Sequence, residues 1–150
     1  MRRSGFTTIE MLIVVALIGI IVLIGFPKIR GTLDQTNVRS ARDAVSTLAV
    51  MARQAAIQRG CTGVLHFASA TNTVWVTTSC PTKVDTVSGV QDLNARFKVT
   101  LSASRDSVRY DPRGLSMDAV STNTVVRLTG GIASHQDSVM INPIGKVVRQ

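Results

Sequence analysis

The chain has 150 residues, a formal net charge of +8 and only 4% aromatic residues. Without an apolar N-terminal segment, about 120 residues remain, which is enough for one domain with a modest core and excludes a multidomain organisation. The basic residues form no long run, so the charge excess mainly favours solubility, although it can also attract DNA, anionic lipid or an acidic partner.

The N-terminal segment combines basic residues, a glycine and a long apolar run. Two arginines precede Gly5, and residues 11–26 contain no charged side chain. The 21 residues from Phe6 to Phe26 carry one charge, and a helix of that length rises about 30 Å, enough to cross the hydrocarbon core of a bilayer. Because an excess of positive charge stays cytoplasmic, the N-terminus is expected inside and the rest exported, although two basic residues beyond the run oppose this orientation.

Two ordinary explanations of this segment leave one residue unexplained. A secretory signal would be cleaved after its apolar region at a small-x-small site, but the candidate at 23–25 has Leu where a small residue is required. An uncleaved membrane anchor is the other alternative. Neither accounts for Glu10, because a lone carboxylate in a membrane costs on the order of a few kcal/mol unless it is paired.

The order of these residues resembles the N-terminus of type IV pilin-like proteins. The resemblance rests on Arg2-Arg3-Ser4-Gly5, Phe6, Glu10 and the apolar run that follows. It implies that a prepilin peptidase cuts between Gly5 and Phe6 and N-methylates Phe6. It also implies a single-pass protein of the bacterial inner membrane, with a leader at 1–5, a transmembrane and assembly helix at 6–27, and a periplasmic pilin-like domain at 28–150.

The same resemblance suggests a role for Glu10 in assembly. No basic side chain lies within one helical turn of it in the sequence. In a bundle of parallel helices, the free amine of a neighbouring subunit's Phe6 can meet this carboxylate, which neutralises both charges and fixes the axial stagger. The alternative is that Glu10 lies hydrated at the level of the lipid headgroups.

A second helical pattern follows the apolar run. Pro27 is expected to kink or loosen the helix, and Gly60 is expected to end it. Charged residues, with Asp34 among them, occupy one face, so helix 28–59 is predicted to be the amphipathic spine of the soluble domain. The other face forms a narrow, alanine-rich stripe of Ile29, Leu33, Ala41, Ala44, Val45, Leu48, Ala52, Ala55 and Ala56.

After Gly60 the sequence changes to short runs rich in Val and Thr, which are typical of β-strands. Residues 80–95 are predicted to be a polar connecting loop. One long helix followed by antiparallel strands predicts an α+β domain in which the helix packs on a β domain at 60–150. The predicted strands are 62–67, 73–79, 96–102, 107–111, 124–129, 138–142 and 145–149.

The two cysteines are predicted to form a disulfide. If the first two strands form a hairpin centred between positions 70 and 71, Phe67 pairs with Val74, and the same register places Cys61 opposite Cys80. Directly opposed residues have Cβ atoms about 5 Å apart, which is close to disulfide geometry. An even pair of cysteines in an exported domain also favours this bond.

Motifs in the soluble half narrow the resemblance to GspH/FimT-type proteins, which are minor pilins of type IV pili and minor pseudopilins of type II secretion systems. The helix end at 52–60, Trp75 in the second strand, the turn Tyr-Asp-Pro-Arg-Gly at 110–114 and the final segment 141–149 occur in the same order. The resemblance implies a structural subunit without a cofactor, which assembles with other pilins or pseudopilins and is a substrate of the peptidase.

The sequence gives no support to catalysis. An enzyme needs a nucleophile, a base and an orienting group, and no nucleophile elbow, phosphate-binding glycine loop or metal-ligand helix motif is present. The two histidines, His66 and His135, are too few and too scattered for a recognisable metal site. The chain is therefore predicted not to be an enzyme and to bind no metal.

DNA capture during natural transformation is the alternative function. Some FimT-type proteins bind DNA through basic residues in a Gly-Arg-x-Arg-like tail, and the corresponding residues here are Gly145, Lys146 and Arg149. The match is partial, because Lys replaces the first Arg and the second basic residue lies one place late. The competing interpretation is that both are solvated charges on an edge strand, where such residues prevent aggregation.

Overall fold

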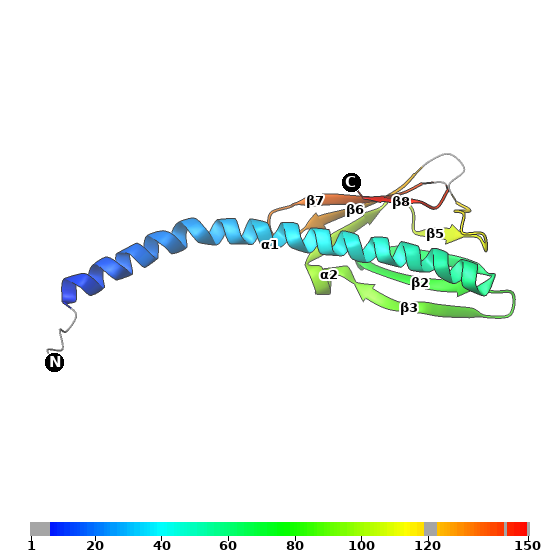
Figure 1. Cartoon of the computed structure of the whole chain (residues 1–150), viewed down its shortest axis with the longest axis horizontal. Coiled ribbons are helices and arrows are strands. Elements are labelled where there is room, and N and C mark those ends of the chain that lie inside the picture. Colours follow the sequence, from blue (N-terminus) through cyan, green and yellow to red (C-terminus); the bar gives the residue numbers. More distant parts are fainter. Residues whose placement is uncertain (1–6, 119–122, 143, 150) are drawn as a thin grey trace.

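The computed structural model describes residues 7–118, 123–142 and 144–149 (Figure 1). Its first element is α1 (Thr8–Arg59), a single helix of 52 residues that is continuous across position 27 and curves in its exposed part (Figure 1). The Thr7 hydroxyl caps the start by accepting the Glu10 backbone N–H at 3.3 Å. Gly60 ends the helix as predicted, with φ of 63°, a left-handed conformation that glycine adopts without strain.

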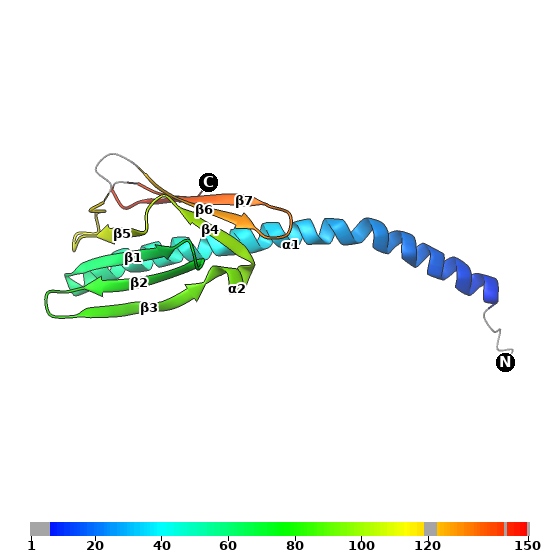
Figure 2. The same cartoon turned by 180° about the vertical axis from the view of Figure 1, so that it is seen from behind.

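Two antiparallel four-stranded sheets lie along the second half of α1 (Figures 1 and 2). The first sheet has the order β3-β2-β1-β5, and the second has the order β4-β6-β7-β8. The strands are β1 (Thr62–Ala68), β2 (Thr73–Ser79), β3 (Val84–Asp92), β4 (Val99–Ala103), β5 (Ser107–Tyr110), β6 (Thr124–Gly130), β7 (Gln136–Ile141) and β8 (Val147–Arg149), and the short helix α2 (Leu93–Phe97) lies between β3 and β4. This arrangement is the predicted α+β domain.

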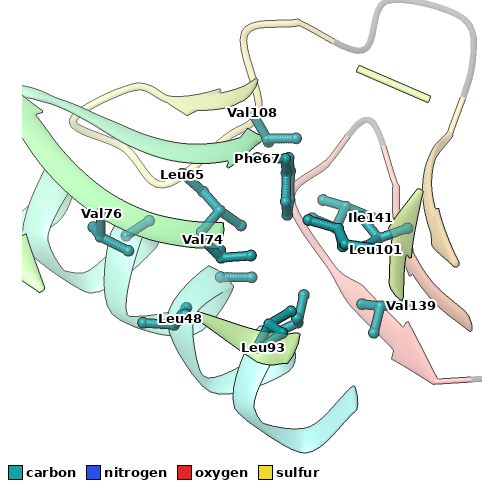
Figure 3. Close-up of a cluster of buried hydrophobic side chains, with 14 of the residues drawn as sticks. Leu48, Leu65, Phe67, Val74, Val76, Leu93, Leu101, Val108, Val139 and Ile141 are labelled. Carbon is teal, nitrogen blue, oxygen red and sulfur yellow. The ribbon is translucent and has the colours of Figure 1, made fainter. Parts of the chain in front are cut away.

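Side chains from α1 and from both sheets share one hydrophobic core (Figure 3). Leu48 of α1 packs in the same cluster as Leu65 of the first sheet and Leu101 of the second. The alanines of α1 allow the sheet to come very close: a Cβ added at Gly63 of β1 would lie 2.2 Å from the Ala52 carbonyl oxygen. The alanine-rich stripe therefore reflects direct packing of the helix against β1.

The predicted stripe is wrong at its beginning. Ile29 and Leu33 are 59% and 53% exposed, and among the described apolar side chains of α1 the first buried one is Val38. Asp34, which was expected on the charged face, is only 1% exposed. The sheets begin to cover α1 only at Asp34. Ile29 and Leu33 therefore have the helical spacing of the stripe but nothing to pack against.

The predicted loop at 80–95 is also wrong. Most of it forms β3, which pairs with β2, and its last residues begin α2, so the strand expected at 96–102 starts later, at Val99. β3 lies at the edge of its sheet, and its valines Val84 and Val90 are 66% and 65% exposed. An edge strand is held by backbone hydrogen bonds to one neighbouring strand. It therefore does not need the alternating apolar pattern from which a strand is predicted in a sequence.

Candidate functional site

The first half of α1 is an uncovered apolar surface. Its large apolar side chains between Ile9 and Phe26 are exposed by between 42% (Val14) and 76% (Leu23). The most apolar stretch of α1 has a mean hydropathy of 3.0, and none of it is buried, so this helix is long and apolar enough to cross a membrane. In water such a surface would aggregate, and it therefore requires lipid or other apolar helices around it.

Glu10 lies at the start of this surface, in the first turn of α1, and is exposed. Together with Thr7 it forms the sequence pattern of a capping box, in which a carboxylate at the third helical position complements the exposed N–H groups of the helix start. Glu10 therefore has a local role in the helix as well as its predicted role in assembly. The predicted cleavage site at Gly5 and Phe6 lies outside the described residues.

Asp34 joins the boundary of the apolar half to the second sheet. Its carboxylate accepts three backbone N–H groups from the β6–β7 loop: Ile132 at 3.1 Å, Ala133 at 3.0 Å and His135 at 3.1 Å. A Cβ at Gly130 would lie 2.3 Å from an Asp34 oxygen, so only glycine fits there. Burial opposes ionisation, but these N–H groups outweigh it and lower the pKa of Asp34 below its ordinary value.

Little in the sequence indicates the Asp34 contact. A carboxylate on the charged face of an amphipathic helix is normally solvated, and its partners lie about a hundred residues further along the chain. The local signal in the sequence is the Gly130-Gly131 pair at the end of β6, which is typical of a turn. The need for glycine at position 130 follows from its contact with Asp34 in the folded protein.

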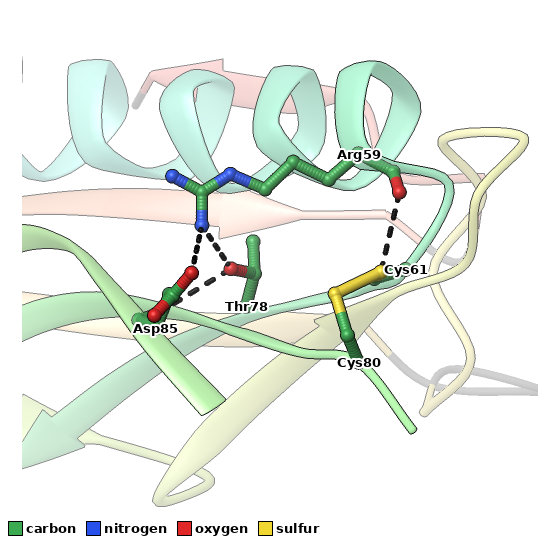
Figure 4. The surroundings of a disulfide bond; sticks show 5 residues. All are labelled: Arg59, Cys61, Thr78, Cys80 and Asp85. Atoms are coloured by element: carbon green, nitrogen blue, oxygen red, sulfur yellow. Dashed lines mark hydrogen bonds and ion pairs between the residues drawn. A yellow bond between two sulfur atoms is a disulfide. The ribbon is translucent and has the colours of Figure 1, made fainter. Parts of the chain in front are cut away.

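The predicted disulfide is present at the other end of α1 (Figure 4). The Cys61 and Cys80 Cα atoms are 5.0 Å apart, and the hairpin has the predicted register, which pairs Phe67 with Val74. Beside it, the Arg59 guanidinium donates to the Thr78 hydroxyl at 2.7 Å and lies 3.4 Å from the Asp85 carboxylate (Figure 4). The end of α1 is thus attached to β2 and β3 by polar contacts next to the covalent bond.

The candidate DNA-binding residues lie at the end of the chain. Lys146 and Arg149 are both exposed, and the Arg149 guanidinium lies 3.5 Å from the carboxylate of Asp43 on α1. Gly145 has φ of 78° and lies against the ring of Tyr110, which gives it a structural reason to be glycine. The structure therefore places these residues together without separating a binding role from a structural one.

The histidines occupy separate places in the domain. His66 of β1 stacks on Trp75 of β2, with ring centroids 4.9 Å apart, and its Nε2 lies 2.9 Å from the Thr77 hydroxyl. Burial lowers the pKa of His66 below its ordinary value. His135 belongs to the loop that contacts Asp34. These contacts account for the positions of both residues as parts of the fold.

A membrane-length helix whose second half packs on two antiparallel sheets is the architecture of the pilin-like class. The family model for the type II transport protein GspH matches residues 41–145. The chain belongs to the GspH family. It is a minor pilin or minor pseudopilin, of a type IV pilus or a type II secretion system, and a structural protein rather than an enzyme.

Solved structures share this fold at low sequence identity. The type IV minor pilin FimU of Pseudomonas aeruginosa is 10% identical with a TM-score of 0.61, over 77% of this chain and 90% of FimU. The minor pseudopilin EpsH from the type 2 secretion system of Vibrio cholerae is 10% identical with a TM-score of 0.59, over 76% of this chain and 96% of EpsH. No curated protein matches the chain significantly.

Proposed function

We propose that the protein is inserted into the bacterial inner membrane through residues 6–27 and is then assembled, with other pilins or pseudopilins, into a filament through α1. Its N-terminus lies in the cytoplasm and its domain in the periplasm. The observation that supports this proposal is the contrast along α1: the part up to Phe26 is apolar and uncovered, whereas the part after Asp34 is packed on the protein's own sheets. A helix surface of this kind suits lipid before assembly and neighbouring helices afterwards.

The leader is removed between Gly5 and Phe6, which leaves Phe6 as a methylated N-terminal residue. The support comes from the two arginines, the glycine and the apolar run that begins at Phe6. Mass spectrometry of the protein purified from its native host is expected to give a chain that begins at methylated Phe6. A chain that begins at Met1, or one that begins near Phe26, would contradict this processing.

Glu10 pairs with the free amine of a neighbouring subunit during assembly. A carboxylate held in a bundle of apolar helices needs such a partner, because leaving it unpaired in lipid is costly. The pairing also sets the axial offset between neighbours. The competing role is local, since Glu10 lies in the first turn of α1, where a negative charge or a capping side chain stabilises the helix.

A pair of substitutions separates these roles. Glu10→Gln removes the charge but keeps a side chain that suits a capping box, whereas Thr7→Ala removes the cap and keeps the charge. Resistance to alkaline extraction measures insertion, and the amount of protein in sheared filaments measures assembly. We expect both variants to insert, with assembly lost only in Glu10→Gln. Normal incorporation of Glu10→Gln into filaments would refute the pairing.

A deletion strain tests which machine contains the protein. Protein secretion, twitching motility and natural transformation should be scored together in the same strain. A defect in secretion alone assigns the protein to a pseudopilus, and a defect in twitching assigns it to a type IV pilus. A defect in transformation with intact twitching would favour DNA capture. Complementation with the intact gene is the control, and complementation with Glu10→Gln is expected to fail.

A further inference from the structure

We propose that the end of the domain nearest the membrane helix is a docking surface for anionic lipid headgroups. This surface, the membrane-proximal rim, consists of Arg96 on α2, Lys98 directly after α2 and Ile132 in the β6–β7 loop. Docking holds the domain against the membrane before the subunit enters a filament. The proposal rests on the proposed function, because it requires residues 6–27 to span the membrane.

The rim is one continuous surface beside the exposed part of α1. Helix α2 and the β6–β7 loop lie at the end of the domain from which the apolar half of α1 emerges (Figures 1 and 2). The Gly131 N–H donates to the Lys98 carbonyl at 3.0 Å, which joins the end of α2 to the loop. Asp34 holds the Ile132 backbone at 3.1 Å and thereby fixes the loop to α1.

The distance along α1 places this surface close to the headgroups. Phe26 ends the apolar run, and Asp34 lies eight residues later, which corresponds to a rise of about 12 Å. The polar layer on each side of a bilayer is about 5–7 Å thick. The rim therefore stands within about one Debye length, roughly 8 Å at physiological ionic strength, of the charged headgroups. Tilting of the helix would bring one side of the rim closer still.

The charge at this end of the domain complements an anionic surface. Arg96 and Lys98 are exposed, and Lys28 and Arg30 lie exposed on the part of α1 that connects the rim to the membrane segment. The Arg30 guanidinium lies 4.6 Å from the centre of the Phe26 ring, so its positive charge is held at the boundary of the apolar run. Basic residues close to an anionic membrane each favour binding to it.

The nearby carboxylates are already engaged within the fold. Asp34 is buried and accepts three backbone N–H groups, and Asp92 caps α2 by accepting the Ala95 N–H at 2.8 Å. This end of the domain therefore carries the four basic side chains named above and these two carboxylates. The remaining excess of positive charge faces the membrane.

Two further features suit an interfacial surface. Ile132 is 51% exposed although its loop is otherwise made of small or polar residues, so its side chain is available to the interface between headgroups and acyl chains. Lys98 has φ of 56°, a left-handed conformation that favours glycine or asparagine at the end of a helix. The fold alone would thus prefer another residue at this position, whereas a lysine there adds a charge to the rim.

Fluorescence resonance energy transfer between the full-length protein and the lipids of vesicles tests the proposal. A donor fluorophore is attached to a cysteine introduced at Asn94, which is exposed on the rim, or at Met117, whose loop packs near Ile57 at the opposite end of α1. The native cysteines are joined in the disulfide and do not react. The acceptor is a headgroup-labelled lipid in vesicles of phosphatidylcholine, with or without phosphatidylglycerol. We expect phosphatidylglycerol to increase transfer from position 94 but not from 117, and high salt to abolish the increase.

Matched charge variants assign the effect to the rim. Arg96→Gln with Lys98→Gln removes two basic residues from the rim, and Lys83→Gln with Lys146→Gln removes two exposed ones elsewhere. Each lost rim cation should weaken docking about fivefold, so the first pair weakens it roughly 25-fold and the second leaves it unchanged. Equal effects of the two pairs, or no response to phosphatidylglycerol, would overturn the proposal.

The same vesicles distinguish this failure from a failure of the proposed function. Protein that alkaline carbonate extracts from the vesicles has not inserted, and that result would contradict membrane insertion itself. Protein that resists extraction but shows no dependence on lipid charge contradicts only the rim. Ile132→Ser should reduce transfer from position 94, and unchanged transfer would exclude Ile132 from the docking surface.

Discussion

The two halves of α1 have the same backbone but different surroundings. From Ile9 to Phe26 the helix is apolar around almost its whole circumference and uncovered. After Asp34 most of the apolar residues lie in a narrow, alanine-rich stripe, and that stripe is buried. The first half needs lipid or other helices to cover it, whereas the second half is already covered by the two sheets. The difference shows that the composition of a helix surface reports how many of its sides will be covered, and by what.

Asp34, at the boundary between the halves, is expected to give the largest effect on stability. Asp34→Ala leaves three N–H groups of the β6–β7 loop without an acceptor and should lower the free energy of unfolding by about 4 kcal/mol. Asp34→Asn keeps one oxygen and should cost about half as much. Urea denaturation of the protein in detergent, followed by the fluorescence of its single tryptophan, Trp75, measures both changes.

The pH dependence separates this role from simple packing. Because the pKa of Asp34 is lowered in the folded protein, its ionised form contributes stability above the unfolded value, about 3.9, and that contribution is lost as the pH falls through the folded value. The difference in stability between the native protein and Asp34→Asn should therefore narrow below about pH 4. A difference that does not change with pH would contradict the role of the charge.

The disulfide concerns the C-terminal end of the half of α1 that packs on the sheets. Cys61 and Cys80 are separated by 19 positions, and a loop of that size corresponds to about 3 kcal/mol of stabilisation. Replacing both with Ser should lower the free energy of unfolding by this amount while membrane insertion stays intact, because insertion depends on the other half of α1. The same double variant is the control for reduction: dithiothreitol should destabilise the native protein and leave the variant unchanged.

Glycine-to-alanine substitutions compare the covered and uncovered surfaces directly. At Gly63 the new Cβ would lie 2.2 Å from the Ala52 carbonyl, so the helix and β1 must separate, at a cost of about 2 kcal/mol. At Gly31 a Cβ meets nothing within 4 Å, and alanine should stabilise the helix by up to about 1 kcal/mol. Thermal unfolding of both variants checks the opposite signs. Destabilisation by Gly31→Ala would indicate that this part of α1 is covered.

Local chemistry accounts for which features the sequence could predict. The helix end at Gly60 and the register of the first hairpin depend on residues close together in the chain, and both are correct. The disulfide followed from that register. The strand β3 and the contact of Asp34 were missed, because an edge strand is held by its backbone and a buried carboxylate depends on a distant loop. Neither kind of information is present in local periodicity.

The smallest expected effect concerns DNA binding. The test compares basic residues at the end of the chain with basic residues on the half of α1 that packs on the sheets. The DNA hypothesis predicts that reversing Lys146 and Arg149 to Glu weakens DNA retardation far more than reversing Arg53 and Arg59. The structure favours a different result, because Arg149 is paired with Asp43, just as Arg59 is with an aspartate of β3.

We therefore expect only weak retardation of double-stranded DNA by the full-length protein in non-ionic detergent, and equal losses in the two double variants. Gel shifts over a range of salt concentrations measure this, since each phosphate contact changes the affinity by about 0.9 log unit per tenfold change in salt. A shallow salt slope shared by both variants indicates general attraction to a domain with 15 basic and 8 acidic residues from Lys28 onward. A steep slope that only the C-terminal pair abolishes would instead establish a DNA site at the end of the chain, and the ion pair of Arg149 would then have to open when DNA binds.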